Sequence, residues 1–150
     1  MSLERVSLLH LAFTLAMVGL MTTVQLVVYP QYHFVAEADF AAYVSNHGQR
    51  IGIPLVLFAP AEVLLALGLW LAAPAGRIKQ AAFVSGALLA AAWIITILWF
   101  APQHGQLINE PYDPDRIDRL VDTNWIRTVL WWLRGAAALV LADWSRTTSD

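Results

Sequence analysis

Four long apolar segments separated by polar links dominate the pattern along the chain: Arg5–Tyr29, Ile51–Ala73, Ile78–Ala101 and Asn124–Asp143. Each holds about 20 mainly aliphatic and aromatic residues, which matches a hydrocarbon core about 30 Å thick at about 1.5 Å rise per residue. The first segment is too long for a signal-peptide core and has no small-residue cleavage site, so we expect it to be retained. The pattern predicts one all-α domain over residues 1–150, a four-helix transmembrane bundle.

The two longer links carry helical patterns of their own. From Phe34 to Val44, apolar residues recur at helical spacing between acidic ones, and from Arg116 to Asp122 three apolar residues share one face. These segments predict short amphipathic helices capping one side of the bundle, the first of them lying on the membrane surface. We expect Asp115 to cap the second helix and Thr123 to cap the fourth span.

The composition and the charge distribution predict where the protein is located and how it is oriented. The chain is 59% hydrophobic and 13% charged, which is unusual for a soluble domain and typical of an integral membrane protein. Four spans place both termini on one side, here called side A, and the longer links on the opposite side B. The short link on side A carries Arg77 and Lys79 with no acidic residue, which favours cytoplasmic termini, as in a bacterial inner membrane.

Two charged residues lie deep inside apolar segments. Glu62 is 11 residues after Ile51, and Arg134 is 10 residues after Asn124. At about 1.5 Å per residue, both lie about 15 Å below side B. Because each charge costs about 2.5–3.5 kcal/mol at the centre of a span, we expect the two to form an ion pair. The pair is either a packing bridge or part of a functional site.

Polar and aromatic side chains form one stripe on each span, and every stripe runs inward from side B. At spacings of three and four residues, the members of a stripe share one helix face. His10, about two turns in from side A, is the exception. The stripes predict a polar funnel that opens to side B and ends at the Glu62/Arg134 layer. Their members are Thr22, Gln25, Tyr29 and His33; His47, Arg50, Pro54, Phe58 and Glu62; Trp93, Thr96, Phe100 and His104; and Asn124, Arg127, Trp131 and Arg134.

The funnel suggests specific roles. We assign Glu62 as a base, with Arg134 and Arg127 stabilising an anion or a carbonyl group. Tryptophan at helix ends is ordinarily an interfacial anchor, so the deeper Trp93 and Trp131 are the better candidates for cavity walls. Such a site favours a flat apolar ligand such as a quinone or a polycyclic phenol. The predicted cofactor or ligand contacts are Gln25, Tyr29, Arg50, Trp93, Asn124 and Trp131.

Three histidines, His33, His47 and His104, lie at the side-B ends of different elements. Imidazole is the commonest ligand for zinc, copper and iron, so a transition-metal site is one interpretation. Interfacial histidines bonded to backbone or water are the other. Haem b between His47 and His104 is a further alternative, although neither histidine is well inside a span. The absence of cysteine excludes disulfides, thiolate metal sites and c-type haem attachment.

The start of the fourth span, Thr123-Asn124-Trp125-Ile126-Arg127-Thr128, followed by Trp131 and Arg134, resembles a pattern in small bacterial four-span membrane proteins of unknown function. These are loosely similar to the anthrone-oxygenase-like membrane family. Asn124, Trp125 and Arg127 match the recurrent Asn, aromatic residue and Arg of that group, whereas the histidine expected nearby in the last span is absent. The resemblance implies cofactor-independent oxygenation.

These features together predict a small integral membrane oxidoreductase or ligand-binding protein. Its expected partners are the lipid bilayer and a hydrophobic small molecule. The alternative is a non-catalytic accessory subunit of a larger membrane complex, or a homo-oligomer, because the Ala-rich third span suits close helix packing. The net charge of −2 carries no information about nucleic acid. Nucleic acid is not expected, because no basic stripe is present.

Overall fold

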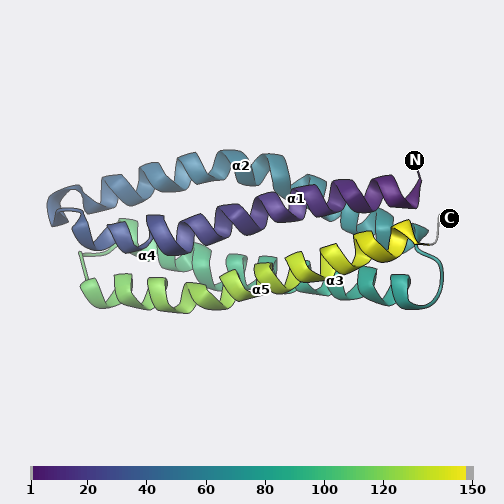
Figure 1. Cartoon of the computed structure of the whole chain (residues 1–150). Coiled ribbons are helices and arrows are strands. Elements are labelled where there is room, and N and C mark those ends of the chain that lie inside the picture. The colour runs from purple at the N-terminus through teal and green to yellow at the C-terminus, as the bar shows by residue number, and fades with distance from the viewer. Residues whose placement is uncertain (1, 148–150) are drawn as a thin grey trace.

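A computed structural model describes residues 2–147 of the chain. Within this range it contains helices and no strand, arranged as four antiparallel rods that lie side by side (Figure 1). The predicted all-α four-helix bundle is confirmed. The rods consist of α1 (Leu3–Thr23), η1 (Val24–Val28) and η2 (Pro30–Phe34); α2 (Glu37–Ala72); α3 (Arg77–Ile95), η3 (Thr96–Phe100) and α4 (Ala101–Asn109); and α5 (Pro114–Arg146).

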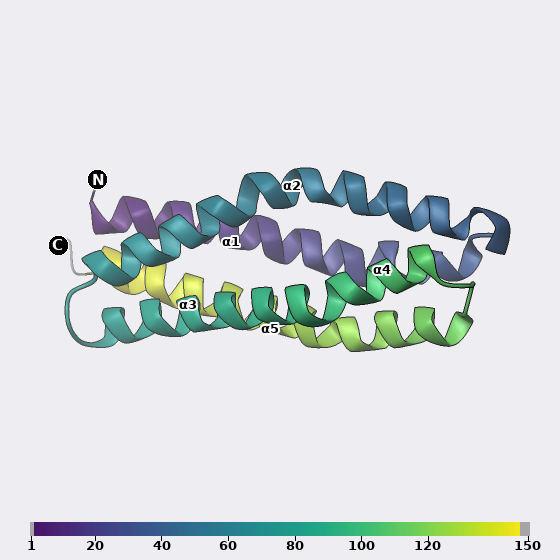
Figure 2. The same ribbon diagram turned by 180° about the vertical axis from the view of Figure 1, so that it is seen from behind.

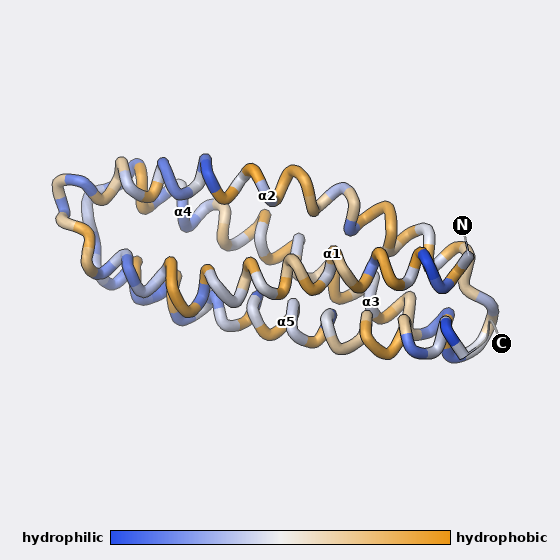
Figure 3. The backbone as a smooth tube through the Cα atoms, turned by 45° about the horizontal axis from the view of Figure 1, so that its top comes forward, coloured by the Kyte–Doolittle hydropathy of each residue, from blue (hydrophilic) through white to orange (hydrophobic). Residues whose placement is uncertain are grey.

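All four rods are long and apolar enough to cross a membrane, which indicates an integral membrane protein. They contain 32, 36, 33 and 33 residues. At about 1.5 Å per residue each is about 50 Å long, whereas a hydrocarbon core is about 30 Å thick. The polar segments gather at both ends of the bundle, and more of the chain is polar at the end away from the termini (Figure 3). The rods therefore extend beyond the membrane mainly on side B.

The predicted capping segments are helical, but they are not separate helices. Residues Phe34–Val44 were expected to form a surface helix, whereas α2 begins at Glu37 and continues without a break into the second span. Likewise, Arg116–Asp122 forms the first turns of α5. The caps on side B are thus direct extensions of the spans.

The two predicted helix caps are wrong in position. Asp113, not Asp115, is the N-cap of α5, and its carboxylate accepts a hydrogen bond from the backbone N–H of Asp115 at 3.0 Å. Pro114 follows at the first helical position, where a missing N–H costs nothing. Thr123 lies inside α5, and its hydroxyl donates to the carbonyl of Arg119. Because α5 starts ten residues earlier than the expected span, no cap is needed at Thr123.

Prolines shape the rods near the cavity described below. Pro54 and Pro60 lie inside α2, which bends along its length in Figure 2. Such bending is expected where proline removes a backbone donor and its ring meets the preceding turn. On the first and third rods, the π-helical turns η1 and η3 come just before Pro30 and Pro102. A π turn widens the helix there and gives each proline ring room.

Apolar side chains fill the bundle in three layers. The side-B layer is aromatic and includes Tyr32, Phe40 and Phe100. Met17, Met21 and Trp131 belong to the middle layer. The side-A layer contains Leu69, Ile78 and Leu141. Polar groups interrupt this core at two levels, and these two levels are the candidate sites.

Candidate functional site

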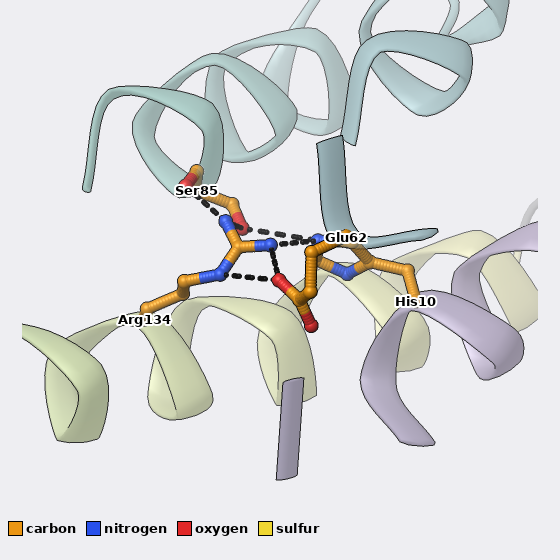
Figure 4. Close-up of polar contacts among 4 residues, drawn as sticks. All are labelled: His10, Glu62, Ser85 and Arg134. Carbon is orange, nitrogen blue, oxygen red and sulfur yellow. Dashed lines mark hydrogen bonds and ion pairs between the residues drawn. The ribbon is translucent and has the colours of Figure 1, made fainter. Parts of the chain in front are cut away.

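One side chain from each rod meets in a buried polar cluster, here called the quartet: His10 from α1, Glu62 from α2, Ser85 from α3 and Arg134 from α5 (Figure 4). None of the four is more than 1% exposed. The Arg134 Nε donates to Glu62 Oε2 at 3.0 Å, and a second guanidinium nitrogen donates to the same oxygen. The predicted Glu62–Arg134 ion pair is therefore formed.

The remaining donors of Arg134 reach the other two helices. Its Nη1 donates to the backbone carbonyl of Ser85 and, at 3.2 Å, to the Ser85 hydroxyl. Its Nη2 donates to His10 Nε2 at 3.1 Å. One guanidinium thus ties together all four rods.

His10 is the member of the quartet that the sequence pattern does not connect with Glu62, because its position gives only a depth from side A. A signal for it was present. Ser7, His10, Thr14, Met17 and Met21 recur at helical spacing, and all five are buried on one face of α1. A histidine inside such a face is placed to contact the core.

The quartet is closed. Neither Glu62 nor Arg134 lines the two cavities described below. The Trp131 ring, whose centre is 5.8 Å from the Arg134 guanidinium carbon, lines the smaller of these cavities. The packing is not fully satisfied, because His10 Nδ1 is buried without a hydrogen-bond partner in the described part of the chain. Such atoms are costly. The quartet therefore fixes helix positions at some expense in stability.

A second group, here called the side-B cluster, comprises Tyr29, His47, His104 and Arg127. An Arg127 guanidinium N–H donates to the Tyr29 hydroxyl oxygen at 3.1 Å. That hydroxyl is also 3.1 Å from His104 Nε2, while His104 Nδ1 is 2.8 Å from the carbonyl oxygen of Phe100.

These contacts assign a direction to the hydrogen bonds. A carbonyl only accepts, so Nδ1 of a neutral His104 carries the hydrogen, and Nε2 accepts from the Tyr29 hydroxyl. The result is a chain of donors from Arg127 through Tyr29 and His104 to the Phe100 carbonyl. Tyr29 and His104 therefore form one continuous hydrogen-bonded pair beside Arg127.

Aromatic contacts hold this chain in place. The rings of His47 and His104 are nearly parallel, with centroids 6.4 Å apart. His47 also meets the Tyr29 ring edge-on at 6.3 Å. The Arg127 guanidinium lies 4.5 Å from the centre of the Phe100 ring, a cation–π geometry that orients it toward the cluster.

The side-B cluster borders a cavity of about 170 Å³, here called the side-B cavity. Gly48 and Ala101 on its wall are exposed, so the cavity opens between α2 and α4. A smaller cavity of about 20 Å³ shares part of this wall and is bounded by Trp93 and Trp131. The side-B cavity is lined by Met21, Val24, Tyr29, Val44, His47, Gly48, Ile51, Leu55, Thr96, Phe100, Ala101, His104, Ile108 and Arg127.

The predicted site residues thus separate into groups. Tyr29, His47, His104 and Arg127 line the side-B cavity, and Trp93 and Trp131 line the smaller one. The other predicted contacts lie on neither wall. Gln25 Oε1 accepts from Asn124 Nδ2 at 2.7 Å between η1 and α5, and Arg50 is exposed, with its Nε donating to Asn46. The single funnel expected from the sequence is therefore divided by Trp131 into an open part and a closed part.

The predicted three-histidine metal set is not brought together. His33 lies apart, with its Nε2 3.4 Å from Asp118 Oδ1. Across the described residues, 2–147, no group of three or more His, Asp or Glu side chains is placed to hold a metal ion. A haem between His47 and His104 also fits poorly, because both nitrogens of His104 are hydrogen-bonded and the cavity is below the roughly 300–1,000 Å³ of drug-sized ligand sites.

The three residues that carry the resemblance at the start of the fourth span face different surroundings. Arg127 faces the side-B cavity, and Asn124 faces Gln25. Trp125 is 40% exposed, with its ring 5.9 Å from that of Trp132. Comparison of the chain with protein-family models, curated proteins and solved structures found no match.

Proposed function

We propose that this protein binds a flat apolar ligand carrying a carbonyl or hydroxyl oxygen, of the quinone or phenol class, in the side-B cavity, and exchanges a proton with it. We place it in a bacterial inner membrane with its termini in the cytoplasm, because the short link with Arg77 and Lys79 contains no acidic residue and positively charged loops face the cytoplasm. The observation that carries the proposal is the position of the Arg127–Tyr29–His104 chain on the wall of a mostly apolar cavity.

The size of the cavity limits the ligand. An engineered apolar cavity of about 150 Å³ holds benzene, so about 170 Å³ accommodates one six-membered ring. Side chains such as Met21, Ile51, Leu55 and Phe100 supply the apolar contact. A polycyclic phenol, as the anthrone-oxygenase resemblance implies, would have to extend through the opening between α2 and α4.

The location of the opening suits a ligand dissolved in the membrane. The four predicted apolar segments end near Tyr29, Ile51, Ala101 and Asn124, which is the level of the cavity. A lipophilic ring can therefore enter sideways between α2 and α4 at the edge of the hydrocarbon region, with its oxygen toward the polar wall.

The polar wall supports one chemical step. A ligand hydroxyl placed against Tyr29 gives its proton to the Tyr29 oxygen while Tyr29 passes its own proton to His104 Nε2. The proton then resides on His104, and the ligand is left as an oxyanion beside the Arg127 guanidinium, whose Nε is buried without a partner in the described chain. This is general-base catalysis with electrostatic stabilisation of the product. Because a phenolate is oxidised more easily than a phenol, the step suits an oxidoreductase as well as a binding protein.

The proposal is tested by closing the opening with one side chain. Gly48 lies on the cavity wall, and a Cβ added there meets no atom within 4 Å, so Gly48→Leu should fill the opening without disturbing α2. Gly52, one turn further along, has the same free space but is not on the wall, so Gly52→Leu is the matched control.

Binding of a short-chain benzoquinone and its quinol is measured by quenching of tryptophan fluorescence, to which Trp93 and Trp131 near the cavity contribute. We expect saturable quenching by the unmodified protein and by Gly52→Leu, and an affinity at least about ten-fold weaker, about 1.4 kcal/mol, for Gly48→Leu. Equal affinities for the two variants would place the ligand elsewhere, and quenching that never saturates would refute the ligand class.

A further inference from the structure

Two apolar grooves flank α3, which forms the side-A half of the third rod. The groove between α3 and α5 has a volume of about 370 Å³, and the one between α2 and α3 about 510 Å³. Both are shallow because small residues line them: Ala81, Ala136 and Ala137 in the first, and Ala82, Gly86, Ala87 and Ala90 in the second.

Each groove has a cation stacked on a tryptophan at its side-A end. The Arg77 guanidinium lies 5.1 Å from the centre of the Trp144 ring, and the Lys79 ammonium lies 5.0 Å from that of Trp70. Arg77 and Trp144 belong to the wall of the α3–α5 groove, and Trp70 to that of the α2–α3 groove. Within residues 2–147, neither cation forms an ion pair. The two charges are therefore available to an outside anion.

The surroundings of these cations are also positive. Among the described residues, the side-A end carries two more positive than negative charges. The four positive residues are Arg5, Arg77, Lys79 and Arg146, and the two negative ones are Glu4 and Asp143. Arg146 lies 4.0 Å from Glu4, which leaves the cations beside α3 as the main source of the excess. Basic sites between membrane helices on one leaflet are suited to anionic lipid head groups.

We propose that the two grooves bind anionic phospholipids of the side-A leaflet, with one acyl chain lying in each groove and a phosphate on Arg77 or Lys79. From Arg77 to Val84 the groove descends seven residues along α3, about 10 Å, from the head-group level into the hydrocarbon. The tryptophans lie at the level of the ester groups, where the indole ring is favoured in membranes. This lipid site is independent of the side-B cavity.

The test is native mass spectrometry of the full-length protein in detergent, titrated with phosphatidylglycerol or with phosphatidylcholine of the same chain length. We expect tighter retention of phosphatidylglycerol, and a loss of about five-fold in its affinity on Arg77→Gln or Lys79→Gln, as one cation near a membrane surface contributes. The matched control is Arg146→Gln, which removes the same charge from the same end of the bundle but not from a groove.

A second variant tests the groove itself. Ala136→Leu keeps every charge and fills the α3–α5 groove, so it should reduce the number of retained phosphatidylglycerol molecules by one. Equal retention of the two lipids, or an equal loss on Arg146→Gln, would overturn the proposal in favour of nonspecific surface charge. A protein dimer that disappears on Ala136→Leu would overturn it as well, because the groove would then hold a second copy of the chain.

Discussion

The quartet and the side-B cluster are built from similar groups, yet they differ in what surrounds them. Each contains a histidine, an arginine and a hydroxyl group. The quartet is sealed, with exposed fractions of 0–1%, whereas His47 and His104 are half-buried and border a cavity with an opening. An ionisable residue in a membrane span is thus a candidate functional residue, but it needs a neighbouring cavity to reach a ligand. Without such a cavity, we expect its role to be structural.

The quartet and the side-B cluster also differ in the contacts that their arginines make. Arg134 makes contacts to three other rods, so a shift of any one rod disturbs the same guanidinium. Arg127 contacts Tyr29 and Phe100 on the cavity wall, where we propose that the ligand binds. The comparison therefore predicts stability effects from the quartet and binding effects from the cluster.

The largest effect should come from breaking the ion pair. Glu62→Ala leaves the Arg134 charge buried without a counter-ion and should cost about 3–5 kcal/mol of unfolding free energy. Replacing both charges, Glu62→Leu with Arg134→Met, should recover most or all of that loss, because apolar residues of similar volume often replace a buried pair without cost. Unfolding by titration with sodium dodecyl sulfate measures both.

The same double variant can break the comparison. If the quartet only fixes packing, the double variant should still bind benzoquinone with unchanged affinity in the fluorescence assay. A protein that unfolds like the original but no longer binds would mean that Glu62 and Arg134 act on the ligand, as the sequence pattern suggested.

A smaller effect, on binding, should follow from removing one hydroxyl of the cluster. Tyr29→Phe removes the link between Arg127 and His104 and should weaken quinol binding about ten-fold, or about 1.4 kcal/mol. This is near the lower limit for one hydrogen bond to a charged group. Tyr32→Phe is the matched control, because the Tyr32 hydroxyl is buried without a partner in the described residues and does not line the cavity. Equal losses in the two variants would show that the Tyr29 hydroxyl does not meet the ligand.

The smallest effect concerns the hydrogen bond between Gln25 and Asn124. It lies near the level of the cluster, but it is buried between η1 and α5 and away from the cavity wall, so it should behave like the quartet. Gln25→Leu also removes the hydrogen bond from Gln25 Nε2 to the Val121 carbonyl, so it should lower the unfolding free energy by about 1.2 kcal/mol, which is two bonds at the average of about 0.6 kcal/mol between membrane helices. Its quinol affinity should stay within error of the original; a clear loss would extend the functional region beyond the cavity wall.

The fold and the ion pair could be predicted because each rests on a strong, local constraint. A membrane span needs about 20 apolar residues, and a buried charge needs a partner at equal depth. The continuity of α2 from Glu37 to Ala72 could not be predicted, because an amphipathic segment next to an apolar one has the same pattern with or without a break. The division of the funnel depended on where the Trp131 ring packs, which is a tertiary contact.

The contact of His10 and the two π turns could not be predicted from the sequence either. A stripe of side chains gives an angle around its own helix, but not the offset between helices, so His10 could not be matched in depth to Glu62. Likewise, no single-residue pattern distinguishes Val24–Val28 or Thr96–Phe100 from ordinary helix. The only feature of the sequence that is consistent with a π turn is the proline after each of them, Pro30 and Pro102.

The π turns set the rotational phase of everything beyond them. Each holds one residue more per turn than the α-helix, which turns the following segment by about 100° about the rod axis relative to an uninterrupted helix. Tyr29 and His104 both lie just after such a turn, and they face each other only because both segments carry this rotation. A one-residue deletion in either turn would therefore re-aim the wall of the cavity while leaving the spans in place, so ligand preference in this architecture can change through helix phase without any exchange of side chains.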